Sequence, residues 1–352
     1  MNDPYGNSVV SYYPDFKDGK SEFQDLLYFQ ESDDIRGSDV DFSSTSRFGA
    51  RQGVYGIMTN SHALPSYMSP VVVNSRADAT SYFDKSIDDV TVYNKSCRVG
   101  IDTYFDMNIA IPFFKSLLQD AFVRYMGTMY WAWGSYTTNS VSKYISIAKP
   151  YGGSHSQIFH GGVCNSINIS GSEMYNVIRM TSSFMFSDRS FTSVPRAVVY
   201  EDDNIYKFLS ASPSMYISNT PYPDIQVPIN LLGFDITFTN NLKPHYRYTD
   251  YISAYELGRF SITGSISIGW DQRSEQVFKS NVHEYRNSGT PMKLGISWGA
   301  SGSNGYLSMQ IQFFVTNVQE TYIGGELALI INFRGTDQFN IMFVDTTIDR
   351  GY

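Results

Sequence analysis

Cysteine and charged residues are both scarce in this chain of 352 residues. The only cysteines are Cys97 and Cys164, too few for a disulfide framework or a zinc cluster. We therefore expect two small buried hydrophobic residues in a protein made in a reducing cytoplasm. Charged residues account for 17% of the chain, below the usual ~25%. The 26 Lys and Arg against 34 Asp and Glu give a net charge of −8, which argues against wrapping of nucleic acid by clustered cations.

Long apolar runs are missing as well. No stretch approaches the ~20 residues that span a bilayer, and the segment after Met1 has neither the basic nor the apolar region of a secretory signal. We therefore expect no membrane insertion. Apolar residues nevertheless make up 42% of the chain and aromatic residues 16%, which argues against disorder. The length suits about two domains at roughly 100–200 residues each.

The clearest pattern that is present is the alternation of apolar and polar residues, which is typical of strands with one buried face. The predicted strands are Arg98–Ile111, Tyr144–Ile147, Val163–Ile169, Val177–Phe186, Phe234–Thr239, Arg259–Trp270, Met292–Trp298, Leu307–Val315 and Ile323–Phe333. Helical spacing is rarer. It predicts a helix over Phe113–Met126, starting after Pro112 and closed by Gly127, and a weaker one within Ser274–Tyr285. The fold class is mainly β, an antiparallel sandwich or barrel.

The order of these elements repeats, which suggests a duplication. Each half reads strand, helix, strand, glycine turn and two further strands. We predict two tandem β-sandwich or barrel domains, each with one helix: residues 1–200, with an inserted loop or arm over 60–93, and residues 229–352. Residues 201–228 form the predicted linker region, since Ser210–Pro228 is rich in proline. The alternative is a chance succession of two ordinary β-domains.

Sequence patterns that could carry chemistry are few and lack their context. Gly295–Gly299 matches the Gly-x-Ser-x-Gly nucleophile motif, but a strand rather than a helix is predicted after it, and the last histidine, His283, precedes Ser297. His155 and His160 lie beside glycines and are predicted as solvated loop residues. The acidic stretch Glu31–Asp41 departs from the spacing of a calcium loop and is predicted as a solvated loop. We expect no catalytic residue, no metal site and no cofactor.

One aromatic segment stands out. Tyr130, Trp131, Trp133 and Tyr136 fall in a predicted loop, where burial against another subunit would explain so many large aromatic side chains. They are the candidate inter-subunit residues.

The second half carries a resemblance to a known family. The run Gly233–His245, followed by Glu256–Ser265, resembles the major tail tube proteins of long-tailed (siphovirus- or myovirus-like) bacteriophages. In that family a strand and an Asn-Asn-x-x-Pro turn precede a Gly-Arg-x-x-Ile/Val-Thr-Gly-Ser/Thr strand, and Gly324–Leu327 is similar to the Gly-Gly-Glu/Asp element before the closing strand. Ser46–Gly53 and Gly161–Ile169 in the first half are similar more weakly.

The resemblance implies a structural virion protein without catalytic residues. Its copies would form stacked rings of the phage tail tube, the conduit for genome ejection, after synthesis and assembly in the host bacterial cytoplasm. The implied partners are further copies of the chain, the tape measure protein in the lumen, and the tail terminator and distal tail or baseplate proteins at the ends. Phage DNA would pass through without specific binding.

Two further expectations follow from the resemblance and the repeat. Family tubes close a β-barrel from six equivalent domains per ring, so a chain with two such domains favours a trimer of pseudo-sixfold symmetry over a hexamer. Polar residues of the alternating strands would face the lumen. The candidates are Asp102, Asp106, Asn108, Asp235, Thr237, Ser261, Thr263, Ser265 and Ser267. The alternatives are a tail terminator, distal tail or adaptor ring protein of the same tail, and, from another class, a carbohydrate-binding β-sandwich module.

Overall fold

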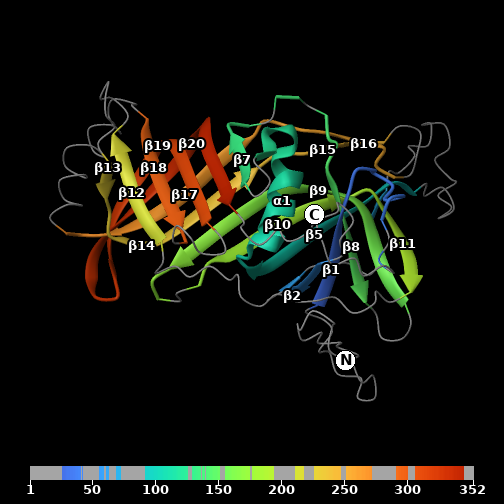
Figure 1. The fold of residues 1–352 in the computed structure, drawn as a ribbon, viewed down its shortest axis with the longest axis horizontal. Helices are drawn as coiled ribbons and strands as arrows, with labels where there is room; N and C mark the ends of the chain where they lie inside the picture. The colour runs from blue at the N-terminus through green and yellow to red at the C-terminus, as the bar shows by residue number, and fades with distance from the viewer. Residues whose placement is uncertain are drawn as a thin grey trace, which may run out of the picture.

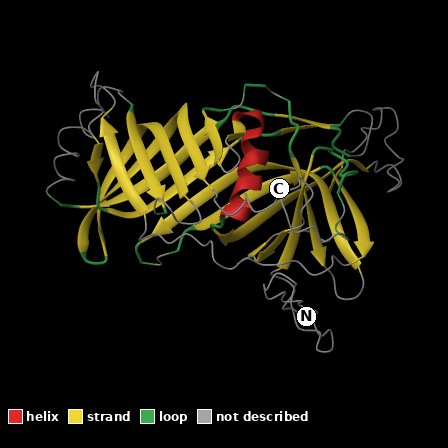
Figure 2. Cartoon of the chain, viewed as in Figure 1, coloured by secondary structure: helices red, strands yellow, loops and turns green. Residues whose placement is uncertain are grey.

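The computed structural model gives a long antiparallel β structure crossed by a helix (Figures 1 and 2). It describes residues 26–40, 42, 55–58, 61–62, 69–72, 92–125, 129–135, 137–138, 140–150, 155–174, 177–193, 211–217, 226–246, 251–271, 291–299 and 306–344. The prediction of a mainly β fold is confirmed. In this described part, no helix is both long enough and apolar enough to cross a membrane.

The first half of the chain contributes the strands up to β11 and the helix. Its elements are β1 (Leu26–Ser32), β2 (Tyr55–Met58), β3 (Ser61–His62), β4 (Ser69–Val72), β5 (Val92–Tyr104), α1 (Met107–Leu118), β6 (Phe122–Tyr125), β7 (Met129–Trp133), β8 (Tyr144–Pro150), β9 (His155–Ser172), β10 (Arg179–Phe186) and β11 (Asp188–Ser193). A short 3-10 turn, Gln119–Ala121, follows α1.

The second half contributes strands only, in the part of it that is described. They are β12 (Ala211–Ile217), β13 (Gln226–Pro228), β14 (Leu231–Thr239), β15 (Lys243–His245), β16 (Ala254–Glu256), β17 (Ser261–Gly269), β18 (Met292–Trp298), β19 (Tyr306–Ile323) and β20 (Glu326–Val344). β12 and β13 fall within the predicted linker region, yet β12 pairs along its whole length with β18.

The strand order of the first half recurs in the second. The first half pairs in the order β3-β5-β10-β9-β8-β1-β2. The second pairs in the order β14-β17-β20-β19-β18-β12-β13. Every pairing is antiparallel. Both halves carry a register shift at the same place: Asn165 is skipped where β9 meets β10, and Thr316 is skipped where β19 meets β20. The boundaries of the two predicted domains remain a prediction.

The two halves are joined by strand pairing rather than by a linker alone. β14 lies alongside the end of β9, with Gly233 opposite Ser172 and Thr239 opposite Ser166 (Figure 1). We call this contact the seam. A second contact pairs β7 of the first half with the end of β20, from Met129 opposite Val344 to Trp133 opposite Asn340. One sheet therefore runs through both halves.

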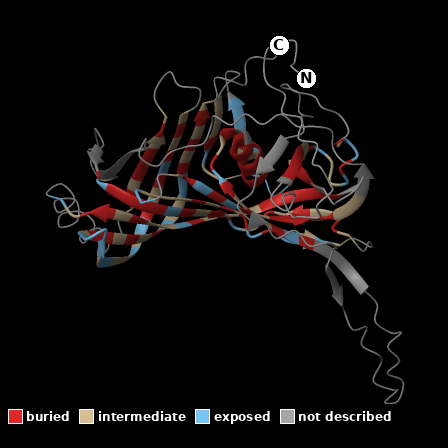
Figure 3. Cartoon of the chain, turned by 90° about the horizontal axis from the view of Figure 1, so that it is seen from below, coloured by how far each residue is buried: buried red, intermediate tan, exposed pale blue. Residues whose placement is uncertain are grey.

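Helix α1 covers the apolar side of this sheet across the seam. The ring of Phe113 packs edge-on against Phe184 of β10, with the centroids 4.7 Å apart, and Phe114 packs against Phe238 of β14 at 5.6 Å. Both phenylalanines of α1 are fully buried, and one continuous core cluster contains residues of both halves. Figure 3 shows the buried positions on the helix and alternating along the strands.

The helix lies earlier in the chain than the sequence pattern predicts. The predicted strand Arg98–Ile111 ends at Tyr104, and α1 begins at Met107 and ends at Leu118, so the predicted bounds Phe113–Met126 were wrong. Met107 and Ile111 fit a helical spacing as well as they fit alternation, and Phe114 continues the helical spacing only. Pro112 stands inside the helix rather than before it. The predicted helix Ser274–Tyr285 lies outside the described residues.

Candidate functional site

The side of the sheet opposite α1 is a continuous polar face. It is built by β5, β10, β9, β14, β17 and β20, whose alternation directs apolar residues to the helix and polar ones away from it. We call it the polar face. One row of directly opposed residues crosses all these strands: Asp102, Thr181, Asn168, Thr237, Thr263 and Arg334. The neighbouring row holds Arg179, Ser170, Asp235, Ser265 and Asn332. The polar face therefore continues across the seam without a break.

Hydroxyl and amide groups dominate the polar face. The side-chain amide of Asn168 donates to Asp235 Oδ1 at 2.7 Å and to Thr237 Oγ1 at 2.8 Å, which ties the two halves together across the seam. The guanidinium of Arg179 pairs with the carboxylate of Asp102. Among the described residues of this face, the charged side chains are Arg98, Asp102, Arg179, Asp235, Glu326 and Arg334. Acidic and basic groups thus balance, and no cationic groove forms.

Most of the candidate lumen-facing residues share this face. Asp102, Asp235, Thr237, Ser261, Thr263, Ser265 and Ser267 all lie on it by strand register. Asp106 and Asn108 do not share this face, because the strand predicted through them was wrong and β5 ends at Tyr104. The backbone carbonyl of Asp106 accepts from the N–H of Ala110 at 2.8 Å as α1 begins, and Asn108 lies within α1.

The sequence reasoning missed the contribution of β9 and β10 to the polar face. Ser166, Asn168 and Ser170 alternate with the fully buried Ile167 and Ile169. That alternation was the signal that could have found them. On β10 the signal is weaker, because a buried serine, Ser182, interrupts the apolar positions.

The Asn-Asn turn after β14 anchors the seam. Asn240 is fully buried, and its side-chain amide donates to the carbonyl of Leu117 at 2.6 Å and to that of Cys164 at 3.1 Å. It thereby connects the end of α1, β9 and β14. Asn241 adopts a left-handed backbone with φ 53°, which asparagine tolerates better than most residues, and its amide donates to the carbonyl of Arg259 at 2.7 Å.

Comparison with family models identifies the family to which this chain is similar. The family model described as phage tail tube protein matches residues 44–335, which is most of the chain and includes the polar face, the seam and the Asn-Asn turn. The chain belongs to the phage tail tube protein family. A search of curated proteins found no match.

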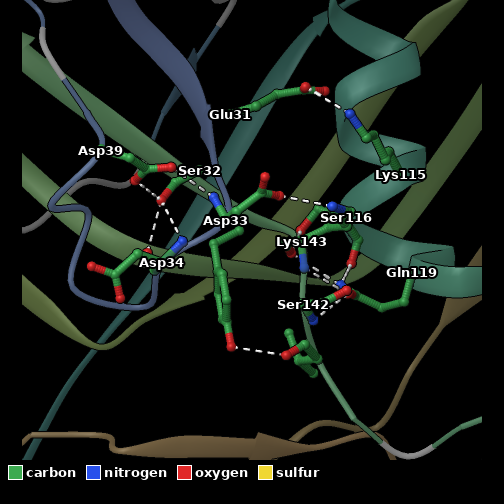
Figure 4. A network of polar contacts seen from close by, with 12 residues as sticks. Glu31, Ser32, Asp33, Asp34, Asp39, Lys115, Ser116, Gln119, Ser142 and Lys143 are labelled. Carbon is green, nitrogen blue, oxygen red and sulfur yellow. Dashed lines mark hydrogen bonds and ion pairs between the residues drawn. The ribbon is translucent and has the colours of Figure 1, made fainter. Parts of the chain in front are cut away.

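In this tail tube protein, polar contacts fix α1 against the strands that flank it (Figure 4). Lys115 of α1 pairs with Glu31 of β1 at 2.8 Å. Gln119, fully buried just beyond the helix, accepts through Oε1 from the backbone N–H groups of Ser142 and Lys143 at 3.0 and 2.9 Å, and its amide nitrogen donates to the carbonyl of Ser116. These contacts hold the helix in place over the seam.

The described part of the acidic stretch, residues 31–40, forms hydrogen bonds and ion pairs within the chain. The carboxylate of Asp34 accepts from the backbone N–H groups of Arg36 and Ser38, and hydrogen bonds from these two residues lower the pKa of Asp34. Asp33 pairs with Lys143 at 2.7 Å. Among the described residues, no group of three or more His, Cys, Asp or Glu side chains is arranged to hold a metal ion.

The prediction that His155 and His160 are solvated loop residues was wrong. Both lie in β9, and His160 is buried, with its Nε2 2.6 Å from Ser190 Oγ. Burial lowers the pKa of His160, and the nearby carboxylates of Asp188 and Asp34 oppose this shift. The imidazole is therefore held neutral as a structural group.

The two cysteines and the serine of the Gly-x-Ser-x-Gly match all lie in strands of this tail tube protein. Cys97 and Cys164 are buried, as predicted, and burial raises the pKa of Cys97 to about 12 and that of Cys164 above its usual range. Ser297 lies within β18, which leads to the strand β19, and its hydroxyl donates to Ser308 Oγ at 3.3 Å. The strand–turn–helix context of a hydrolase serine is thus replaced by a hairpin.

The aromatic segment is a strand, so the loop predicted there was wrong. Met129, Trp131 and Trp133 alternate with their neighbours in β7, which pairs with β6 on one side and with β20 on the other. Tyr130 stacks on Phe122 with centroids 5.7 Å apart, and Trp131 Nε1 donates to Asn340 Oδ1 at 2.5 Å. Trp133 is 66% exposed. Tyr136 lies outside the described residues.

Proposed function

We propose that this tail tube protein self-assembles into stacked rings that form the conduit for phage genome ejection. The observation that carries the proposal is the polar face, a continuous sheet surface that spans both halves of the chain and is backed along its other side by one core. Such a sheet can form the wall of a tube, because its inner side needs only water-compatible groups and its outer side is already covered.

The polar face would line the bore. DNA is a polyanion that binds clustered cations tightly, whereas a wall of hydroxyls and amides with balanced charges lets it slide. Lysine at Thr181 and Thr263, two exposed residues of the row that crosses all six strands, should leave tubes intact and slow genome ejection from phage particles. Normal ejection from such particles would count against the bore assignment.

The repeated strand order supports a ring of three chains. Each chain would supply two equivalent positions, so three chains would fill the six positions of a ring with pseudo-sixfold symmetry. The two halves differ in sequence and in loops, which suits alternating positions. Within the predicted insertion 60–93, β3 corresponds to β14 of the second half. The rest of the insertion has no counterpart in the sequence pattern of the second half and would then mark every second position.

Contacts between rings would involve the exposed aromatic residues of β7. Trp133 is 66% exposed and Trp131 is partly buried, whereas Tyr130 is already packed on the core of its own chain. Exposed aromatic anchors often carry much of an interface's binding energy. Trp133→Ala should change the stability of the free subunit by less than about 0.5 kcal/mol, as for other surface positions, and should impair polymerisation measured by light scattering. Unchanged polymerisation would remove Trp133 from the interface.

In the virion, the expected partners are the tape measure protein inside the tube and the terminator and distal tail or baseplate proteins at its ends. The chain would be made and assembled in the bacterial cytoplasm before it becomes part of the tail.

Electron microscopy of the purified protein tests the function. We expect long tubes whose averaged cross-sections show three strong outer features alternating with three weaker ones. Six identical features would contradict the ring of three chains but would still support the tube-forming function. Single rings would indicate a terminator or adaptor protein instead, and monomers that bind glycans would indicate a carbohydrate-binding module.

A further inference from the structure

Two equivalent strand edges of this protein differ in whether they are occupied. The last part of β9, residues 166–172, pairs with β14 on one side, and its residues 166–170 pair with β10 on the other. The last part of β19, residues 317–323, pairs with β20 on one side, and no other strand in the described part of the chain pairs with its second side. We call this second side the open edge.

The shared register shift fixes which residues correspond. Asn165 of β9 and Thr316 of β19 are the residues skipped in the two pairings. Counting onward, Ser166 corresponds to Asn317, and Ser172 corresponds to Ile323. The seam on β9 therefore maps onto the open edge of β19 residue by residue.

Side-chain exposure agrees with an edge that lacks its neighbour. Ile167 and Ile169, on the occupied edge of β9, are fully buried, whereas the corresponding residues of β19 are the partly buried Val318 and the exposed Glu320. At the end of the open edge, Tyr322 is 74% exposed and Ile323 is 36% exposed. A strand edge with unpaired backbone groups and exposed apolar side chains readily pairs with another chain.

The partner strand follows from the same correspondence. β14 pairs with β17, with Gly233 opposite Ser267 and Phe234 opposite Ile266. In the first half β3 holds this position on β5, with Ser61 opposite Asp102 and His62 opposite Ile101. Among the described residues, β3 pairs with β5 alone. β3 therefore occupies on β5 the position that β14 occupies on β17. Unlike β14, which also pairs with β9, β3 has no strand paired with its second side among the described residues.

We infer that the open edge of β19 binds β3 of a second copy of this chain by antiparallel strand pairing, in the register of the seam. Ile323 then lies opposite Ser61 of the second copy, as Ser172 lies opposite Gly233 within the chain. The inference rests on the proposed ring assembly and names the edge and register that make the lateral contact.

Cysteine crosslinking between two differently substituted chains tests the register. Directly opposed residues of antiparallel strands place their Cβ atoms about 4.5–5.5 Å apart, a separation from which a disulfide can close with a small adjustment. Chains carrying Ser61→Cys are mixed with chains carrying Ile323→Cys, assembled and oxidised. We expect covalent dimers on a non-reducing gel from the mixture and not from either variant alone. The native Cys97 and Cys164 are buried and do not interfere.

A matched mixture controls for general proximity. Tyr322→Cys in place of Ile323→Cys moves the thiol to the opposite side of the strand, so crosslinking to Ser61→Cys should fall at least several-fold. Equal crosslinking at both positions would overturn the register.

A charged substitution at the open edge tests the contact independently of crosslinking. Tyr322→Lys and Ile323→Lys should fold normally, because both side chains are exposed, and should abolish ring and tube formation. Met174→Lys is the matched control: Met174 is 84% exposed but follows β9, whose edge is already filled, so its tubes should form. Tubes that form with both edge variants and without crosslinks would overturn the edge and leave the proposed function standing. If the native protein forms neither rings nor tubes, both fall.

Discussion

The two halves of this tail tube protein share one strand order but differ in where the corresponding strands end and in what those ends contact. In the second half β20 runs unbroken for 19 residues, so its last part extends to β7 of the first half. In the first half the corresponding run is divided into β10 and β11 at Ser187, whose buried hydroxyl lies 2.9 Å from the carbonyl of Ile35. At the break, Ser187 contacts the acidic stretch of its own half, whereas the unbroken β20 pairs with a strand of the other half. The comparison teaches that the repeat is conserved in its pairing order and altered where strands end.

The largest expected effect comes from the two phenylalanines that α1 directs to different halves. Phe113→Ala and Phe114→Ala should each lower the free energy of unfolding by about 3–5 kcal/mol, because both rings are fully buried. Phe113 contacts Phe29 and Phe184 of the first half, whereas Phe114 contacts Phe238 and Phe343. Urea unfolding gives the loss. Hydrogen exchange should show faster opening of β1 and β10 in the first variant and of β14 and β20 in the second.

Equal loss of protection everywhere in both variants would break the comparison. It would mean that the shared core unfolds as one unit and that the two halves have no separate stability.

A smaller effect is expected at the glycine of the family motif. A Cβ at Gly264 would lie 2.4 Å from the carbonyl oxygen of Asp235 and 2.7 Å from the ring of Phe333. The position that corresponds in the first half, opposite Phe184, holds Val99, so the two halves make room differently. Gly264→Ala should destabilise by about 1–3 kcal/mol through overpacking. Ser265→Ala, one residue on and on the polar face, is the control and should stay within about 0.5 kcal/mol. A neutral Gly264→Ala would refute the steric account.

The smallest effect should appear as a pH dependence confined to the first half. Burial holds the pKa of His160 below its ordinary value of 6.5. Between the folded and unfolded pKa values the unfolded chain binds the proton more readily, so this contribution is intact above about pH 6.5 and is lost as the pH falls. The loss is at most about 1.4 kcal/mol per pH unit.

Hydrogen exchange at pH 7.5 and 5.0 measures this dependence. Protection of β8, β9 and β11 should fall at the lower pH more than that of β18 and β19, and His160→Gln should remove the difference. A native protein whose two halves respond alike to pH would exclude His160 as the cause.

Alternation predicted the strands whose two faces differ most. The predicted bounds of β18, Met292–Trp298, match the structure, because apolar and polar residues alternate there without interruption. At Met107–Ile111 the same apolar residues satisfy two periods, and most of the described side chains of α1 are buried, so no clear polar stripe is present to decide between them. His160 was wrongly predicted as a solvated loop residue because glycines follow it in the sequence. Gly161 serves a close approach, since a Cβ there would lie 2.1 Å from the carbonyl of Ile35.

The candidate site was partly predictable for a related reason. Which residues face away from the core follows from alternation within each strand, so Asp235, Thr237 and Thr263 were placed on the polar face. Which strands lie side by side depends on pairings between distant segments. Neither the seam between β9 and β14 nor the pairing of β7 with β20 leaves a local trace in the sequence.

The seam also has a kinetic consequence. Because β9 and β14 belong to one polypeptide, their contact forms during folding, at an effective concentration set by the chain and not by the solution. Only contacts between chains then respond to dilution and bear the loss of translational freedom on association. The concentration dependence of nucleation should therefore reflect the number of chains in a ring, not the number of equivalent positions around it.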